Sequence, residues 1–239
     1  MLAPFIGSFL GVVVMRADAP RTILFGRSIC DGCGAVLGPR DLVPVASWIA
    51  LKGRCRHCAH ALGAFYPVIE IAAVIIALWS ASVAEGAPMW AGDVLGWTLL
   101  ALAAIDLRSY LLPDFLTLPL MLAGLIATAI FASDMLAANA IGAAAGFAFI
   151  VALRALYRLV RGREGIGLAD AKLMAAAGAW IGWTGLPSVL LVASISGLAF
   201  ALLRAARKGT LSALERIPFG PFLCLGIWIV WLYGPLTLT

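Results

Sequence analysis

Charged residues are scarce in this chain of 239 residues. Asp, Glu, Lys and Arg together make up 12% of the sequence, about half of what soluble domains carry. The sequence also lacks a sustained heptad and a glycine period, which excludes coiled coil and collagen, and its low charge excludes disorder. Hydrophobic residues make up 63% of it, and the mean hydropathy is +1.04. A single soluble core could not cover so much apolar surface, so the composition indicates a polytopic membrane protein.

The apolar segments predict an all-α fold with about eight transmembrane helices, because one span needs about 20 mostly apolar residues. The predicted spans are residues 2–15, 67–84, 88–105, 115–133, 137–160, 171–184, 186–203 and 217–236. The first and sixth are short; residues 2–15 rise only about 21 Å at ~1.5 Å per residue. A signal peptide is the alternative for the first, but no basic residues precede its apolar stretch.

The basic residues predict the orientation of these spans. All 17 Lys and Arg residues lie in or beside alternate connections: after the first, third, fifth and seventh spans. By the positive-inside rule these connections are cytoplasmic and both termini lie outside. We therefore expect three parts: a first transmembrane helix (1–15), a cytoplasmic loop (16–66) and a seven-helix membrane core (67–239). The net charge of +5 is explained by topology and anionic lipid, so nucleic acid is not predicted as a partner.

Two CxxC pairs lie in the long loop, Cys30–Cys33 and Cys55–Cys58. Their spacing is close to that of four-cysteine zinc sites, and neighbouring arginines favour the thiolate form. Disulfides are an alternative, but cytoplasmic thiols stay reduced. A redox CxxC is another alternative, although it needs only one pair. We expect structural zinc bound by all four cysteines, with His57 and His60 at the surface.

Two aspartates are predicted at the cytoplasmic ends of spans. Asp106 follows an apolar run that closes the third span, and Asp170 opens the sixth. Two spans lie between them and return the chain to the same side, so the pair can meet at one depth. Placing a carboxylate in or near a membrane costs free energy, so each such residue needs a structural or functional explanation. Two of them sharing a proton satisfy the requirement for aspartyl proteolysis, in which one activates water and the other polarises the scissile carbonyl.

Simpler interpretations of the acidic residues stay open. Asp106 could pair with Arg108, and Asp170 could cap its helix. Asp114 follows a proline and is best interpreted as a helix cap. Glu70 could pair with loop arginines or face the site. Asp93 and Asp134 are interpreted as ordinary surface groups on the outer side.

Several motifs together resemble the type IV prepilin peptidases along nearly the whole chain. Tyr66-Pro67-Val68-Ile69-Glu70 resembles the entry to that family's second helix, and Asp106 stands eight residues before the Asp of Pro113-Asp114. The segment from Gly167 to Lys172 resembles the family's GxGD motif, with Ala169 at the second glycine. The remaining matches are Gly7 to Leu10, Gly26 to Ser28, the two CxxC pairs, Asp41 to Val45, and Ser47-Trp48.

The resemblance implies an intramembrane aspartyl endopeptidase of the bacterial inner membrane. It would cut basic leader peptides from type IV prepilins or type II secretion pseudopilins at the cytoplasmic face. By motif position, Asp106 and Asp170 would be catalytic, and Cys30, Cys33, Cys55 and Cys58 would bind zinc. Members with this long loop often also N-methylate the new terminus with S-adenosylmethionine, although no glycine-rich nucleotide fingerprint is present. A peptidase without methylation, a proton-coupled transporter and a non-catalytic zinc scaffold are the alternatives.

Overall fold

The computed structural model describes residues 2–17, 26–162, 165, 167–208 and 217–236. Within these ranges the regular elements are helices, and the only β-type pairings are two isolated bridges. Of the basic residues in the connections predicted to be cytoplasmic, Arg21, Arg163 and Arg216 lie outside the described ranges. The chain divides into two compact units, residues 1–89 and 90–239.

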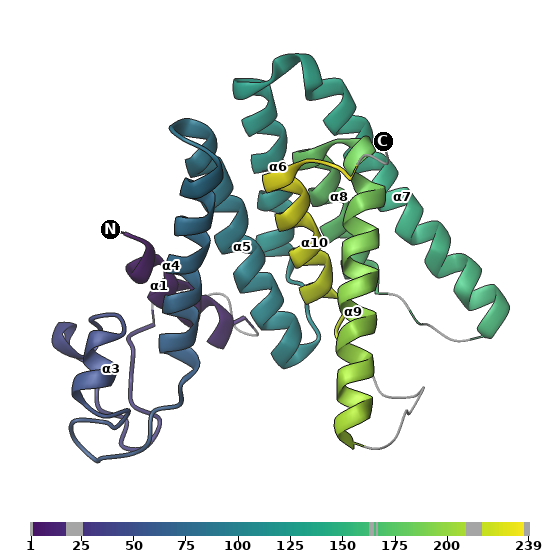
Figure 1. Cartoon of the computed structure of the whole chain (residues 1–239). Coiled ribbons are helices and arrows are strands. Elements are labelled where there is room, and N and C mark those ends of the chain that lie inside the picture. The colour runs from purple at the N-terminus through teal and green to yellow at the C-terminus, as the bar shows by residue number, and fades with distance from the viewer. Residues whose placement is uncertain (1, 18–25, 163–164, 166, 209–216, 237–239) are drawn as a thin grey trace. The chain divides into compact units, whose positions relative to one another are not determined.

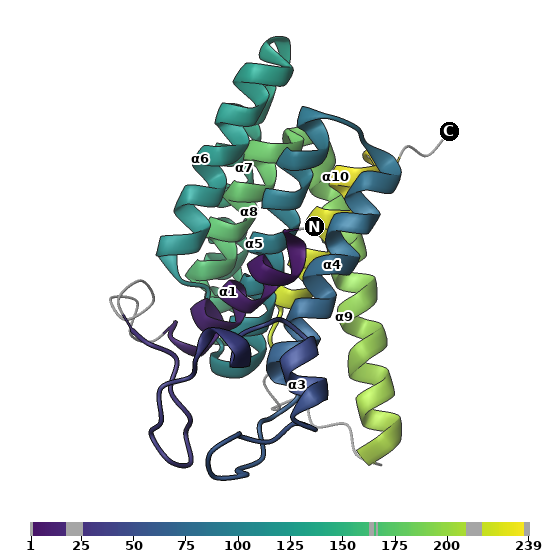
Figure 2. The ribbon, with the colours of Figure 1, turned by 90° about the vertical axis from the view of Figure 1, so that its left-hand side faces the viewer.

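The first unit contains two apolar helices and the cysteine-bearing loop. Helix α1 (Ala3–Met15) packs against α4 (Phe65–Val83) (Figures 1 and 2). The packing is close because glycines of α1 face α4: a Cβ on Gly7 would lie 2.6 Å from the Glu70 Cα, and one on Gly11 would lie 2.7 Å from the Tyr66 ring. Between them, the loop contains the 3₁₀ turn η1 (Pro39–Asp41) and α3 (Ala46–Ala50).

The second unit is a helical bundle that contains most of α5 (Ala87–Ser109). Its other helices are α6 (Asp114–Phe131), α7 (Leu136–Arg161), α8 (Leu168–Ile181), α9 (Leu186–Lys208) and α10 (Gly220–Tyr233), with 3₁₀ turns η2 (Ser133–Met135) and η3 (Trp183–Gly185). Helix α8 contacts α6, α7, α9 and α10 and is the most enclosed of them (Figure 1). Small residues permit this enclosure, because five of its buried side chains are alanine.

Glycines bring α7 and α8 into backbone contact. A Cβ on Gly142 would lie 2.7 Å from the Gly182 carbonyl carbon, and one on Gly146 would lie 2.6 Å from the Met174 carbonyl oxygen. Near the C-terminal end of α8, the Asn139 amide donates to Thr128 Oγ1 (2.7 Å) and to the Ala179 carbonyl (3.1 Å). Such small-residue contacts and interhelical hydrogen bonds hold helices together where lipid removes the hydrophobic driving force.

Within the described part of the chain, five helices are long and apolar enough to cross a membrane. They are Phe65–Val83, Ala87–Ser109, Asp114–Phe131, Ser133–Arg161 and Trp183–Arg207, which correspond to five of the predicted spans. Their outer faces carry large exposed apolar side chains such as Leu78 and Ile130, each 67% exposed. Such surface is typical of contact with lipid.

The prediction of eight spans is not confirmed. Where the first and eighth spans were predicted, the structure has shorter apolar helices, Ala3–Met15 and Gly220–Tyr233. Where the sixth was predicted, α8 has 14 residues, about 21 Å of helix against a hydrocarbon core of about 30 Å. An apolar run does not distinguish a spanning helix from a short helix enclosed by protein, which explains the difference.

Candidate functional site

Asp106 and Asp170 come together in the second unit, as their topology predicted. Asp106 lies in the last turn of α5 and is only 6% exposed. Asp170 is the third residue of α8 and is half-buried. The two carboxylates are near enough for their charges to interact. The structure thus places two acidic groups, from segments 64 residues apart in the sequence, at one end of the bundle.

The Asp106 carboxylate is held by the first residue of α10. Its Oδ2 accepts a hydrogen bond of 3.0 Å from the backbone N–H of Gly220. The first four N–H groups of a helix have no partner within the helix, and the helix dipole favours negative charge there. Among the described residues, the structure shows no ion pair between this carboxylate and Arg108, the pairing considered above.

Asp170 does cap its own helix, as the simpler interpretation proposed. Its Oδ2 accepts a hydrogen bond of 3.2 Å from the backbone N–H of Gly167, the N-cap residue of α8. Within the described part of the chain this bond occupies one carboxylate oxygen and leaves Oδ1 available. Capping fixes the side chain in one orientation, so the cap is compatible with a catalytic role.

A nearby ion pair joins the first turns of α6 and α8. The Lys172 ammonium contacts both carboxylate oxygens of Asp114, at 2.6 and 2.7 Å. The interpretation of Asp114 as a helix cap is wrong, because the N-cap of α6 is Pro113 and no side-chain hydrogen bond caps the helix. Asp114 is instead the first residue of α6, where the helix dipole stabilises an acidic side chain. The Asp114 side chain is 55% exposed, so the pair orients the two helices more than it stabilises them.

The four loop cysteines form one cluster in the first unit. Their Sγ atoms all lie within 4.8 Å of one another, and those of Cys30 and Cys58 are 3.7 Å apart. A tetrahedral zinc ion with Zn–S bonds of about 2.3 Å requires S···S separations of about 3.8 Å. The cluster therefore fits a metal ion of this kind. His57 and His60 are exposed, as expected.

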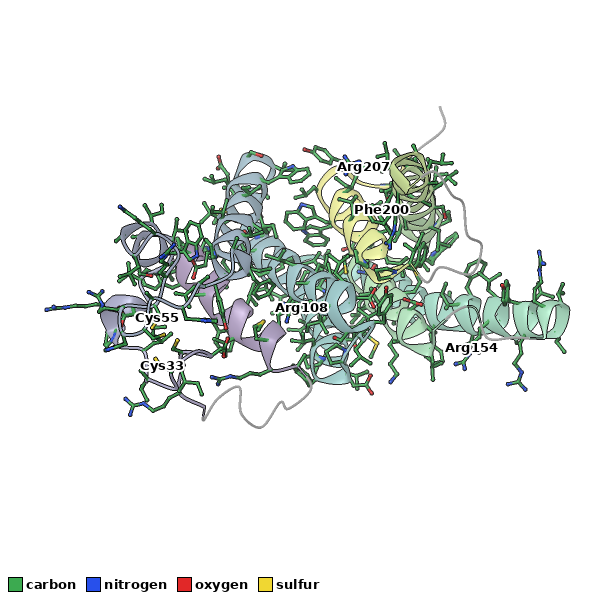
Figure 3. The ribbon with its side chains drawn as sticks, turned by 90° about the horizontal axis from the view of Figure 1, so that it is seen from below. Cys33, Cys55, Arg108, Arg154, Phe200 and Arg207 are labelled. Atoms are coloured by element: carbon green, nitrogen blue, oxygen red, sulfur yellow. The ribbon has the colours of Figure 1, made fainter. Side chains whose placement is uncertain are left out.

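The two CxxC segments have the same backbone structure. Cys30 N–H donates to the Ala35 carbonyl, and Cys55 N–H donates to the His60 carbonyl, each five residues further on. In both segments the N–H two residues after the first cysteine points at its sulfur, at 3.4 Å. Such N–H···S bonds stabilise thiolates, which is the form that binds metal. Figure 3 shows Cys33 and Cys55, one from each segment.

Four ionised thiols as close as these would repel one another. The backbone N–H groups of Cys58 and His57 lower the pKa of the Cys55 thiol to about 6. The N–H of His60 acts on Cys58 in the same direction, but desolvation and the neighbouring sulfurs prevail and raise the pKa of Cys58 to about 12. A bound cation would reverse the cost of placing four negative charges together.

Glu70 has a role that the sequence did not indicate. Its buried carboxylate accepts a hydrogen bond of 2.7 Å from the backbone N–H of Val45. Val45 forms a tight turn between Pro44 and Ala46 with φ 58° and ψ −50°. A β-branched residue with positive φ is strained. No sequence pattern reveals such a backbone position, so Glu70 was expected to pair with arginines or face the site.

Asp93 corrects one interpretation, because it is 3% exposed and belongs to the buried part of α5. An acidic residue in an apolar helix can thus be buried, whereas Asp134, in a 3₁₀ turn between helices, is exposed as expected. Gly220 was missed altogether. The sequence signal for this residue is weak: a Gly220-Pro221 pair precedes an apolar run, and proline is common in the first turn of a helix.

Comparison with known proteins decides the family. Residues 1–83 match the bacterial peptidase A24 N-terminal domain, and residues 93–202 match the type IV leader peptidase family. A protein of Burkholderia pseudomallei (strain 1026b) is 45% identical over 95% of this chain and 81% of its own length. The chain belongs to the type IV leader peptidase family.

Further relatives agree with this membership. Proteins of Aeromonas hydrophila and Pseudomonas aeruginosa are each 37% identical, over 96% and 98% of this chain and 87% and 89% of their own lengths. All three relatives bear the name prepilin leader peptidase/N-methyltransferase. No solved structure matches the chain. Family membership supports a peptidase and gives no support to the transporter alternative.

Proposed function

We propose that this protein is a prepilin leader peptidase in which Asp106 and Asp170 are the catalytic pair. The observation that carries the proposal is the meeting of these two carboxylates, one buried and one half-buried, at one end of the bundle. Each is fixed by one backbone N–H group, from Gly220 and Gly167. Fixed orientation is what a general acid–base pair needs.

The chemistry follows from two carboxyl groups that share one proton. The ionised member takes a proton from a water molecule as this water attacks the scissile carbonyl. The protonated member donates a hydrogen bond to the carbonyl oxygen and stabilises the charge that develops there. The proton then passes to the leaving amine, so that the pair returns to its starting state. Ala169 stands beside Asp170 where the family's motif has glycine, and one methyl group is a small obstacle to a substrate backbone.

The proposed site faces the cytoplasm of a bacterial inner membrane. Basic side chains support this orientation: Arg108, Arg154 and Arg207 come from α5, α7 and α9 (Figure 3), and the positive-inside rule places such connections in the cytoplasm. The substrates would be prepilins or pseudopilins with basic leader peptides. We also propose N-methylation of the new terminus with S-adenosylmethionine, which rests on the relatives' names alone.

The four cysteines would hold a structural zinc ion. Four thiolates complete a tetrahedral shell and leave no open position for water, so the metal would order the loop and take no part in hydrolysis.

Mass spectrometry of a processed prepilin tests the proposal. The purified protein should release the leader from a prepilin, and D106A and D170A should each lower the rate by at least about 10³-fold. D134N is the matched control, because Asp134 is an exposed acidic residue outside the site, and it should cleave normally. Wild-type rates in D106A or D170A would refute the catalytic assignment. Addition of S-adenosylmethionine should add the mass of one methyl group to the product.

A further inference from the structure

Asp106 and Gly220 are joined by a hydrogen bond and are also in close steric contact. A Cβ built on Gly220 would lie 2.6 Å from Asp106 Oδ2 and 3.0 Å from Asp106 Cγ. The third neighbour is Leu112 Cδ1, at 3.3 Å. The Asp106 carboxylate therefore occupies the space that any other side chain at position 220 would need.

Backbone conformation does not explain a glycine at this position. Gly220 is the first residue of α10, and it is not among the glycines with positive φ. Alanine favours helices more than glycine does by about 1 kcal/mol. In terms of local structure, alanine would thus be the better residue, and the close approach of Asp106 is what excludes it.

The hydrogen bond also distinguishes the two oxygens of Asp106. Oδ2 is engaged by an N–H group from a segment 114 residues further along the chain. Within the described residues, Oδ1 is left to act on water. The N-terminus of α10 thus fixes which oxygen is free and where it points, and its dipole favours the ionised carboxylate.

We propose that Gly220 is a positioning residue for Asp106: its missing side chain admits the carboxylate, and its N–H group holds it. This inference rests on the proposed catalytic role of Asp106. In Gly220→Ala the added methyl group displaces the carboxylate while the helix is retained. Misplacement of a catalytic group by about 1 Å can cost about 10²-fold in rate.

A matched control lies on the same helix. A Cβ on Gly226 would lie 2.6 Å from the Val189 carbonyl oxygen on α9, so Gly226→Ala introduces a clash at the same distance, with backbone atoms instead of a carboxylate of the proposed pair. If Gly220 merely lets α10 pack, the two variants should behave alike. If Gly220 positions Asp106, only Gly220→Ala should affect the chemical step.

The first experiment measures kcat, KM and the melting temperature of the full-length wild type, Gly220→Ala and Gly226→Ala in one detergent, with a prepilin as substrate. Below the melting temperature, Gly220→Ala should lower kcat by about 10-fold to 10²-fold with KM changed less than about 2-fold. Gly226→Ala should lower the melting temperature but keep kcat. A wild-type kcat in Gly220→Ala, or an equal loss in both variants, would overturn the proposal.

A second experiment needs no activity and keeps the contact testable if Gly220→Ala is too unstable to assay. The melting temperature is measured for Gly220→Ala and Gly226→Ala with and without Asp106→Ala. Removal of the carboxylate should abolish the penalty of Gly220→Ala and leave that of Gly226→Ala unchanged. Equal penalties in both backgrounds would refute the contact. Failure of the proposed function is distinct, because then wild type and Asp106→Ala would process the prepilin equally.

Discussion

Val45 and Glu70 join the cysteine-bearing loop to α4 through one hydrogen bond of 2.7 Å. The backbone N–H of Val45 donates to the buried carboxylate, and Val45 itself has positive φ. Strain of this kind persists only where the surroundings hold it, and it costs of order 1–3 kcal/mol. The hydrogen bond from Val45 to the Glu70 carboxylate stabilises this strained turn.

Replacement of Glu70 should therefore loosen the loop. Glu70→Ala leaves the Val45 N–H without its acceptor and should lower the free energy of unfolding by about 1–3 kcal/mol. Glu70→Gln retains an acceptor oxygen and should cost less. Thermal unfolding and limited proteolysis of the loop measure the two effects. If both variants were equally destabilised, the acceptor oxygen would not be what matters.

Relief of the strain should have the opposite sign. Val45→Gly keeps the N–H group and removes the branched side chain from a positive-φ position, so it should raise the unfolding free energy by about 1 kcal/mol. The matched control is Val43→Gly, because Val43 lies in the same loop without positive φ and should lose stability. A stability loss in Val45→Gly would argue against strain at this position.

The proposed zinc site predicts a defined stoichiometry. Elemental analysis of the full-length protein should find one zinc ion per chain, and Cys33→Ser should lower it to near zero with faster proteolysis of the loop. Cys224 is buried in α10 and is not part of the cluster, so Cys224→Ala should keep the zinc. A fully protected loop after removal of the metal would contradict its structural role.

The two equivalent CxxC segments differ at one informative position. Gly34 has φ 69° and Ala59, its counterpart, has φ 56°. Alanine is strained there and glycine is not. Ala59→Gly should thus raise the affinity for zinc slightly, and Gly34→Ala should weaken it by about 1 kcal/mol. Competition with a chromophoric chelator measures both; equal effects of the two changes would indicate that φ does not control the segment.

The ion pair between Lys172 and Asp114 should contribute little to stability. Lys172→Met removes an exposed pair and should change the unfolding free energy by no more than about 1 kcal/mol. Its effect on prepilin cleavage should be larger than its effect on stability, because Lys172 and Asp170 share the first turns of α8. Asp114→Asn is the complementary variant, and the same cleavage assay with a melting curve checks both. A large loss of stability without loss of rate would assign the pair a purely structural role.

Sequence patterns were sufficient wherever spacing and periodicity carry the information. The CxxC spacing predicted the cysteine cluster. The alternation of charged connections predicted that Asp106 and Asp170 lie at the same end of the helical bundle. The lengths of α8 and α10 were beyond such patterns, because a short enclosed helix and a spanning helix have the same apolar composition. The contacts of Glu70 with Val45 and of Asp106 with Gly220 join residues 25 and 114 positions apart. Such contacts depend on tertiary packing, which no local pattern encodes.

The backbone contact between α7 and α8 has a consequence for movement. Lipid acyl chains are as apolar as a leucine side chain, so moving a leucine from lipid to another helix gains no hydrophobic free energy. Backbones that meet at Gly142 and Gly146, in contrast, leave no gap for lipid to enter. We therefore expect the two helices to move as one body in any bilayer. Because Asp170 is carried by α8, any displacement of Asp170 relative to Asp106 should then carry α7 along with α8.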